Sequence, residues 1–417
     1  MTTLTVGTDK QYQTLAAAIA ASANGDTILV DAGTYTNDFA HITTNITLTA
    51  VGGMVHLDAT VPPPDGKAIL TTDGNIAING FEFSGAAVAD QNGAGIRMQT
   101  GDLTLTNCWF HDNQEGILTA ADPNSDLIID NCEFGFNGDG SGFTHGVYAG
   151  GIRSLTITDS YFHDTAVGHE IKSRAATTTI SNNRIQDQAG SASYSIDTPN
   201  GGNVSITGNV IEQGPFSQNP YIIAYGEEGL RYAGNSLLIN SNTILNDRVT
   251  TQPLLLNGSG VLTRFTNNDV WGLTAAQLPT GQTGTVFLAA EPPLDTSHPF
   301  SVPTVDDLVL TGGPGRNTLI GGDGDDTFDG RRGRDTITTG EGNDTIIFST
   351  PLARNNVDTV TDFNNLQDAI QLKSSIFASL AGLALNPSSG ALSYEGTAFA
   401  ILHPVGLTLD AINFKLV

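Results

Sequence analysis

The sequence predicts an all-β protein in which a parallel β-helix solenoid with an N-terminal capping helix is followed by a different tail. Three observations predict this fold. Short segments of alternating apolar residues recur about every 25 residues, each segment turns at an Asn, Asp or Gly corner, and a run of glycine-rich nonapeptides follows them. Alternation with a period of two is typical of strands, and a near-constant repeat length is typical of a solenoid.

The repeating segments share alternating apolar residues, a polar corner and a final apolar residue. Their final residues are separated by 27, 24, 28, 23, 26, 33 and 26 positions. A coil of this kind buries its apolar side only by stacking on the next coil, and Asn suits the left-handed backbone of a tight corner. The eight segments are IAINGFEF, LTLTNCWF, LIIDNCEF, LTITDSYF, TTISNNRI, VSITGNVI, LLINSNTI and TRFTNNDV, which end at Phe83, Phe110, Phe134, Phe162, Ile185, Ile211, Ile244 and Val270.

The first fifty residues fit the start of this solenoid. Residues 12–22 are rich in alanine with one apolar face, which predicts a helix, and residues 24–35 predict a turn, a buried strand and a second turn. A helix at this point would cover the open edge of the first coil and prevent it from pairing with another chain.

Composition excludes several classes of protein. The 417 residues include 43 acids and 17 bases, a net charge of −26, which argues against nucleic acid as a partner. The sequence contains no run of 18 apolar residues, so we expect no membrane insertion. The N-terminus lacks a basic start followed by an apolar core, so we expect no Sec-type signal, and two cysteines predict no disulfide framework.

The predicted helix, the sequence GDTILVDAGTY and the Asn-cornered coils resemble the right-handed parallel β-helix superfamily of pectate-lyase-like proteins. The resemblance covers residues 1–290. It implies a right-handed solenoid, but it does not imply one reaction, because lyases, hydrolases, epimerases and inert adhesins share this fold.

A proline-rich linker at 291–305 precedes the tail, which spans 306–417. The tail opens with four nonapeptides in unbroken register, GGPGRNTLI, GGDGDDTFD, GRRGRDTIT and TGEGNDTII, over residues 312–347. These repeats are similar to the calcium-binding nonapeptides of RTX proteins, which implies a small parallel β-roll that binds calcium.

Successive half-coils of such a roll face opposite sides, so each calcium would lie between repeats two apart. The best site would join Asp326 and Asp344, with oxygen ligands that suit a hard cation. A weaker site would join Asn317 and Asp335, because several arginines surround it, and Asp323 is a further candidate ligand.

The end of the chain, with the sequence VDTVTDFNNLQDAIQL, resembles the segment that follows RTX repeats in type I-secreted bacterial proteins. This resemblance implies a secreted protein that meets the type I secretion machinery as a partner. It also implies a tail that folds when it reaches extracellular calcium. We expect a monomer.

Candidate site residues lie on the second strand of successive coils. Aligning these strands by the inward residues Ile96, Ile117, Val147, Ile171, Ile196 and Ile222 predicts one outward row of Arg97, Leu118, Tyr148, Lys172, Asp197 and Ile223. Residues one outward step away add Glu170 and Tyr221 on one side and Arg174 and Tyr225 on the other. His145 and His169 lie at the strand entrance, where a corner would turn them outward.

This set suits abstraction of the C5 proton of a uronic acid in an acidic polysaccharide. Arg174 would bind the carboxylate, and Lys172, Tyr148 or His145 would take the proton, with His169 as a further catalytic candidate. The substrate-binding candidates are Arg97, Glu170, Asp197, Tyr221 and Tyr225. A second group would then protonate the leaving O4, which gives β-elimination by a lyase, or return a proton to the other face of C5, which gives a C5-epimerase.

Several alternatives remain open. The row is also compatible with a solvated ladder of charges, with a hydrolase that uses Glu170 and Asp197, and with a non-catalytic matrix or adhesion protein that binds an acidic glycan. The residues before His169-Glu170 are Val-Gly, where alginate C5-epimerases have Asp-Pro. Cys108 and Cys132 share one coil position, which predicts a reduced pair stacked in the core.

Two further features carry weaker expectations. His111 and His163 share a Phe-His-Asp corner, but an intervening coil separates them, so we expect no metal between them. The longer coil at 226–234, GEEGLRYAG, is a candidate wall of the binding cleft.

Overall fold

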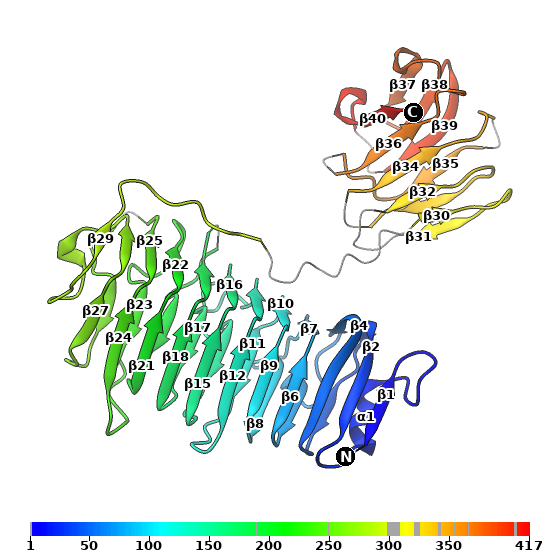
Figure 1. Ribbon diagram of the computed structural model, residues 1–417. Coiled ribbons are helices and arrows are strands. Elements are labelled where there is room, and N and C mark those ends of the chain that lie inside the picture. The colour runs from blue at the N-terminus through cyan, green and yellow to red at the C-terminus, as the bar shows by residue number, and fades with distance from the viewer. Residues whose placement is uncertain are drawn as a thin grey trace. The chain divides into compact units, whose positions relative to one another are not determined.

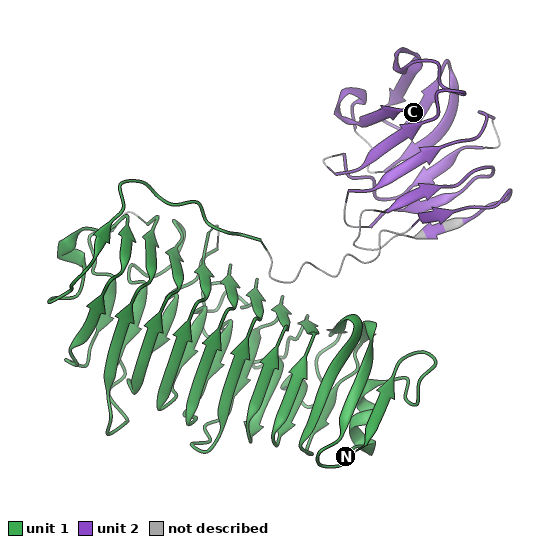
Figure 2. Cartoon of the chain, viewed as in Figure 1, with its two compact units in different colours: residues 1–300 green, residues 301–417 purple. Residues whose placement is uncertain are grey.

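The computed structural model describes residues 2–188, 190–248, 250–297, 309–320, 326–340, 343–353, 356–365, 367–403 and 407–417. The chain forms two compact units, residues 1–300 and residues 301–417 (Figure 2). Asp323, one of the predicted calcium ligands, lies outside the described residues.

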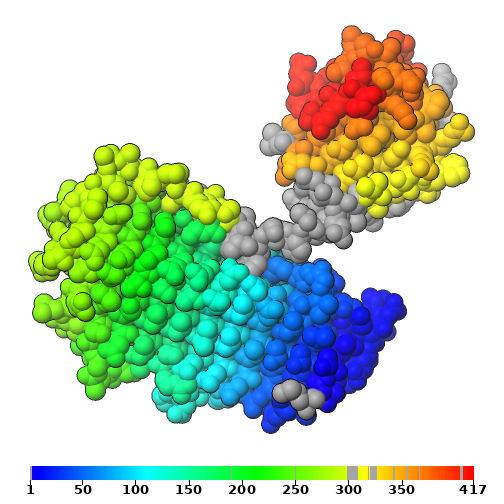
Figure 3. Space-filling view, viewed as in Figure 1, coloured from blue at the N-terminus to red at the C-terminus, as the bar shows by residue number. Residues whose placement is uncertain are grey.

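Unit 1 is a parallel β-helix in which each coil contributes up to three short strands (Figure 1). Equivalent strands of successive coils pair in parallel and form three stacks along the solenoid. In the space-filling view the coils follow one another as bands of colour (Figure 3). The first stack consists of β1 (Thr3–Val6), β2 (Thr27–Thr36), β4 (Ile46–Asp58), β6 (Ile76–Asn79), β9 (Leu103–Thr106), β12 (Asp126–Asp130), β15 (Ser154–Thr158), β18 (Thr177–Ser181), β21 (Asn203–Thr207), β24 (Ser236–Asn240) and β27 (Thr263–Thr266).

The long strands β2 and β4 run through a corner into the second stack, so the first two stacks form one continuous sheet. The third stack forms a separate nine-stranded sheet. The second stack continues with β7 (Phe81–Ser84), β10 (Trp109–His111), β13 (Glu133–Gly135), β16 (Tyr161–His163), β19 (Arg184–Gln186), β22 (Val210–Gln213), β25 (Thr243–Asn246), β28 (Asp269–Trp271) and β29 (Val286–Phe287). The third stack consists of β3 (Ala40–Ile42), β5 (Ala68–Asp73), β8 (Ala94–Thr100), β11 (Glu115–Thr119), β14 (Val147–Ala149), β17 (Ile171–Ser173), β20 (Ile196–Thr198), β23 (Ile223–Tyr225) and β26 (Leu255–Asn257).

The register confirms the repeats that the sequence predicts. The eight final apolar residues pair one with the next from Phe83 to Val270. The phenyl rings of the first four, Phe83, Phe110, Phe134 and Phe162, stack with centroids 4.7–4.8 Å apart. Most corners between the first and second stacks adopt the left-handed backbone, as at Asn107 with φ 54° and Asn131 with φ 48°.

A second ladder runs through the interior, one residue past these corners. Asn183, Asn209, Asn242 and Asn268 are buried, and each side chain donates to the next one or to a backbone carbonyl. Cys108 and Cys132 occupy the same position in earlier coils and are buried free thiols, as predicted. Buried amides are stable here because every one finds a partner in the neighbouring coil.

Helix α1 (Leu15–Ala21) confirms the predicted cap. The Thr14 side chain accepts from the Ala17 backbone N–H at the start of the helix, and Leu15, Ala18 and Ile19 are buried against the first coils. A 3-10 turn, η1 (Ala275–Gln277), lies near the other end of unit 1. None of the helices in the described part of the chain has the length and apolar character needed to cross a membrane.

Unit 2 is a β-roll made of two sheets. One sheet consists of β30 (Val309–Thr311), β32 (Thr327–Asp329), β34 (Thr345–Phe348), β36 (Ala369–Leu372) and β40 (Asn413–Leu416). The other consists of β31 (Thr318–Ile320), β33 (Thr336–Thr338), β35 (Asp358–Val360), β39 (Thr397–Leu402), β38 (Ala391–Tyr394) and β37 (Leu383–Asn386), the last two antiparallel to their neighbours. The turns η2 (Leu380–Gly382) and η3 (Leu409–Ala411) complete the unit. Repeats two apart are therefore neighbours, as the nonapeptide register predicts.

Candidate active site

The third stack brings the predicted outward row together. Arg97, Leu118, Tyr148, Lys172 and Asp197 pair in register across five neighbouring strands. The next partner differs from the prediction, because Ile196 pairs with Ile223 and Asp197 pairs with Ala224. Two consecutive isoleucines at 222–223 fit the alternation equally well, and the alignment by Ile222 was wrong by one residue.

An open groove with a volume of about 720 Å³ lies over β11, β14 and β17. It contains most of the predicted catalytic residues and several that the sequence did not single out. Its lining consists of Asp90, Gln91, Asn92, Glu115, Leu118, Gly142, Phe143, His145, Tyr148, Lys172, Arg174 and Glu228.

Lys172 lies in this groove with its ammonium group held by a buried carboxylate. Its Nζ is 3.2 Å from Asp197 Oδ2, and the Lys172 side chain keeps 14% exposure while Asp197 keeps 1%. His169 Nε2 lies 3.3 Å from the same oxygen. Burial raises the pKa of Asp197, but His169, Glu227 and Lys172 lower it to about 2. Asp197 is therefore an anion that positions the lysine and the histidine.

The two predicted histidines stack on each other, with ring centroids 4.8 Å apart, and the backbone fixes their tautomers. The backbone N–H of His169 donates to His145 Nδ1 at 3.0 Å, and the backbone N–H of Tyr194 donates to His169 Nδ1 at 3.3 Å. Burial and then the charges of His169 and Lys172 hold the pKa of His145 well below its usual range. A neutral His145 with an accepting Nδ1 carries its proton on Nε2, so it can donate a hydrogen bond but cannot act as the base.

Arg174 contacts Tyr148 directly and is occupied on its other side. Its Nε donates to Tyr148 Oη at 2.8 Å, whereas its two terminal nitrogens bind both carboxylate oxygens of Glu228, at 2.5 and 2.8 Å. Asn200 Oδ1 accepts a further bond at 2.7 Å. Glu228 occupies the guanidinium fork that Arg174 was predicted to offer to a substrate carboxylate, and the role of Arg174 stays a prediction.

Three acids of the site were not assigned roles from the sequence. Glu228 comes from the long coil at 226–234, which was a candidate wall of the cleft. Glu227, at the exposed rim, contacts Asp197, and partial burial together with that carboxylate raises its pKa to about 8. Burial also raises the pKa of Glu115 well above its usual range, although its Oε2 accepts a hydrogen bond from the backbone N–H of His145 at 3.0 Å. Glu115 could have been found from the alignment, because it stands two residues before Ile117, as His145 stands before Val147 and His169 before Ile171.

Four predicted substrate-binding residues do not line the groove. Glu170 is fully buried, and both its carboxylate oxygens accept from Thr165, so its predicted outward position is wrong. Tyr225 is also fully buried, because the one-residue shift places it inward, and its hydroxyl donates to Gly202 O at 2.9 Å. Tyr221 donates to Gln252 at 3.2 Å, and Arg97 lies at the far end of the row, where burial lowers its pKa.

The predicted calcium ligands form two ladders in unit 2. The Asp326 N–H donates to Asp344 Oδ1 at 2.8 Å, and the Asn317 N–H donates to Asp335 Oδ1 at the same distance. Asp335 Oδ2 is buried and has no hydrogen-bond partner among the described residues. Adjacent buried carboxylates with an unused oxygen fit a hard cation such as calcium.

Comparisons with known proteins agree with both units. The family described as "Right handed beta helix region" matches residues 64–211. The fold is a right-handed parallel β-helix. The family described as "RTX calcium-binding nonapeptide repeat" matches residues 311–346, so calcium belongs to the C-terminal module.

Two solved structures are similar to the chain at low identity. Pectate lyase Pel9A is 16% identical, with a TM-score of 0.47, over 69% of this chain and 82% of that one. The pectin methylesterase of Aspergillus niger is 14% identical, with a TM-score of 0.42, over 70% of this chain and 91% of that one. No curated protein matches the chain.

Proposed function

We propose that the groove binds an acidic polysaccharide and cleaves it as a lyase, by removing the C5 proton of a uronic acid residue and eliminating the O4 substituent. The observation that carries the proposal is the placement of Lys172 and Arg174 beside Tyr148 in an open groove of a chain with a net charge of −26. These two cations, each paired with a carboxylate, are the groups of the groove lining that can attract a polyanion, which the net negative charge of the chain otherwise repels.

Lys172 supplies the charge that the substrate carboxylate needs. Its ammonium group has three donors, one of which binds Asp197. The other two can bind the substrate carboxylate and stabilise the enolate-like intermediate. Arg174, whose fork is closed by Glu228, acts on Tyr148 instead, where its Nε stabilises a phenolate.

The proton transfers then follow from the remaining groups. The Tyr148 phenolate takes the C5 proton, the C5–H electrons form the C4–C5 double bond, and the C4–O4 bond breaks. The departing O4 takes a proton from Glu227, which is a neutral acid at pH 7 because its pKa is raised to about 8. Solvent exchange restores both groups.

Hydrolysis by two carboxyl groups is less well supported. Glycoside hydrolases separate these groups by roughly 5 Å or more, and Asp197 and Glu227 are in direct contact. In the other predicted pair, Glu170 and Asp197, the Glu170 side chain is buried in the interior of the solenoid.

The test measures ultraviolet absorbance at the new double bond after incubation, with calcium, on pectate, alginate, glucuronan and bacterial exopolysaccharides. We expect one substrate to give a rise that falls about 10²–10³-fold in Lys172→Ala. We expect a similar loss in Tyr148→Phe. Matched controls are Lys10→Ala, which removes a lysine paired with Asp31 at 3.3 Å, and Tyr35→Phe, which removes a hydroxyl bonded to the Asp31 carbonyl.

Each other outcome leads to a different function. A flat trace with a changed proton NMR spectrum of the recovered polymer would replace elimination by C5-epimerisation. Retention of the polymer without chemical change would make the groove a glycan-binding surface. A rate unaffected by Tyr148→Phe would remove Tyr148 from the mechanism.

We also propose that the protein is secreted by a type I system, which the calcium-binding repeats of unit 2 support. Cells that carry a type I exporter should release the full chain into the medium, whereas cells without one should retain it. Release from both would contradict this route.

A further inference from the structure

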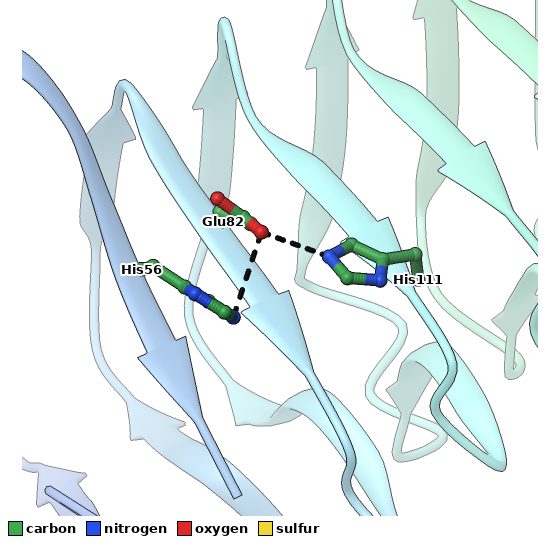
Figure 4. Close-up of side chains that lie close together, drawn as sticks. All are labelled: His56, Glu82 and His111. Carbon is green, nitrogen blue, oxygen red and sulfur yellow. Dashed lines mark hydrogen bonds and ion pairs between the residues drawn. The ribbon is translucent and has the colours of Figure 1, made fainter. Parts of the chain in front are cut away.

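A compact group of metal-binding side chains lies in the second stack, which is a different sheet from the one that forms the groove. His56, Glu82 and His111 come from β4, β7 and β10, which pair side by side (Figure 4). Glu82 Oε1 lies 2.9 Å from His111 Nε2 and 3.5 Å from His56 Nε2. One carboxylate oxygen thus faces two imidazole nitrogens that come from opposite sides.

We propose that His56 Nε2, Glu82 Oε1 and His111 Nε2 bind a divalent transition metal ion of the zinc type. One ligand atom from each residue lies within 4.8 Å of the others, so small side-chain rotations can bring all three onto one ion. Two imidazoles and one carboxylate suit zinc and related ions better than calcium, which prefers oxygen ligands alone. The three side chains keep 14–27% exposure, so water can reach a bound ion and complete its coordination.

The surroundings orient both histidines. His111 Nδ1 lies 2.7 Å from Asp112 Oδ2, the carboxylate–histidine arrangement that positions a metal-binding imidazole. His56 Nε2 lies 2.7 Å from Ser84 Oγ, and this hydrogen bond would be exchanged for the metal. Without metal, burial lowers the pKa of His111, but Asp112 and Glu82 raise it to about 9, so an ion-pair cluster is the competing state.

A second copy of the motif shows which residue makes the difference. His163 Nε2 lies 3.1 Å from Glu133 Oε1, and its Nδ1 lies 2.9 Å from Asp164, as in the first cluster. At the position where His56 pairs with Glu82, however, Trp109 pairs with Glu133. The second copy has no second imidazole at that position, so zinc should prefer the first.

A bound ion would tie three successive strands of the second stack together near the N-terminal end. Because these strands come from separate coils, the metal would act across the solenoid, as a crosslink that raises the thermal stability of unit 1. This role is independent of the proposed lyase activity.

The test is zinc binding by the full chain, measured by isothermal titration calorimetry with ZnCl₂ in excess calcium so that unit 2 is saturated. We expect one zinc ion per chain, with affinity at least about tenfold weaker in His56→Gln. His41→Gln is the matched control, because His41 also pairs with a carboxylate, Asp73 at 2.7 Å, but has no second histidine beside it among the described residues. Its zinc affinity should equal that of the wild type.

A second measurement does not depend on the variants folding. Copper(II) bound to the wild type should give an electron paramagnetic resonance spectrum with two imidazole nitrogens. Absence of stoichiometric zinc binding, equal affinity in His56→Gln and wild type, or a copper spectrum without two nitrogens would each overturn the proposal.

Discussion

The β-helix and the β-roll are both parallel solenoids, but they bury different groups at the positions where their coils stack. The interior of unit 1 carries phenyl rings, aliphatic side chains and a ladder of neutral amides. Unit 2 has a smaller apolar core and places buried carboxylates at, or directly before, the first residue of its strands, namely Asp326, Asp335, Asp344, Asp358 and Asp368. The amides of a neutral ladder satisfy one another's hydrogen bonds, whereas stacked carboxylates repel one another until a cation lies between them. We therefore expect a bound cation to matter for the fold of unit 2 and not for that of unit 1.

Removing calcium should give the largest difference in stability between the two units. Removing calcium with EGTA should abolish the unfolding transition of unit 2 and leave that of unit 1 in place, because the repeats of unit 2 stack buried carboxylates where the interior ladder of unit 1 carries neutral amides. Differential scanning calorimetry of the full chain measures both transitions. The comparison would fail if both survived chelation, or if both were lost together.

Breaking the amide ladder should affect unit 1 alone. Asn209 donates to Ile180 O at 3.0 Å and to Asn242 Oδ1 at 2.9 Å, and it accepts from Asn183. Asn209→Ala leaves buried polar partners unpaired and should lower the free energy of unfolding of unit 1 by about 2–4 kcal/mol. Chemical denaturation followed by circular dichroism measures the change, and the exposed Asn124→Ala should stay within about 0.5 kcal/mol of wild type.

A smaller effect should appear in the pH dependence of unit 1. Burial and then Asp187 raise the pKa of Glu170 to about 8, against the hydrogen bonds from Thr165. In the unfolded chain this carboxyl ionises near about 4.3. The folded state therefore holds the proton more tightly, and the free energy of unfolding should fall as the pH rises from that value toward 8.

Glu170→Gln keeps the neutral shape and should remove part of this decline, by at most about 1.4 kcal/mol per pH unit. Thermal melts of unit 1 between pH 5 and pH 8 test the difference. Parallel curves for variant and wild type would show that Glu170 is not the titrating group.

The fold was predictable because each coil repeats one physical pattern. The alternation sets the inward residues, the Asn corners set the bends, and parallel pairing carries the same position from Phe83 to Val270. The same logic placed Tyr148, Lys172 and Asp197 in one row. Periodicity therefore predicts which residues within the strands share a face.

What the sequence did not predict depends on contacts that do not repeat. Glu228 reaches Arg174 from 54 residues away through a loop whose course no periodicity specifies. Tyr225 was misplaced because two consecutive isoleucines allow either register. His56 was missed as a partner of His111 because the longer early strand that carries it lies outside the run of regular repeats.

Coil-on-coil pairing also determines how the groove can change in evolution. Each strand of the third stack contacts only the strand before it and the strand after it, so a duplication or deletion of one whole coil preserves every remaining pairing. Such an event lengthens or shortens the third stack by one strand spacing, about 4.8 Å. Under the proposed function, the number of sugar residues that the groove accommodates would be inherited in units of whole coils.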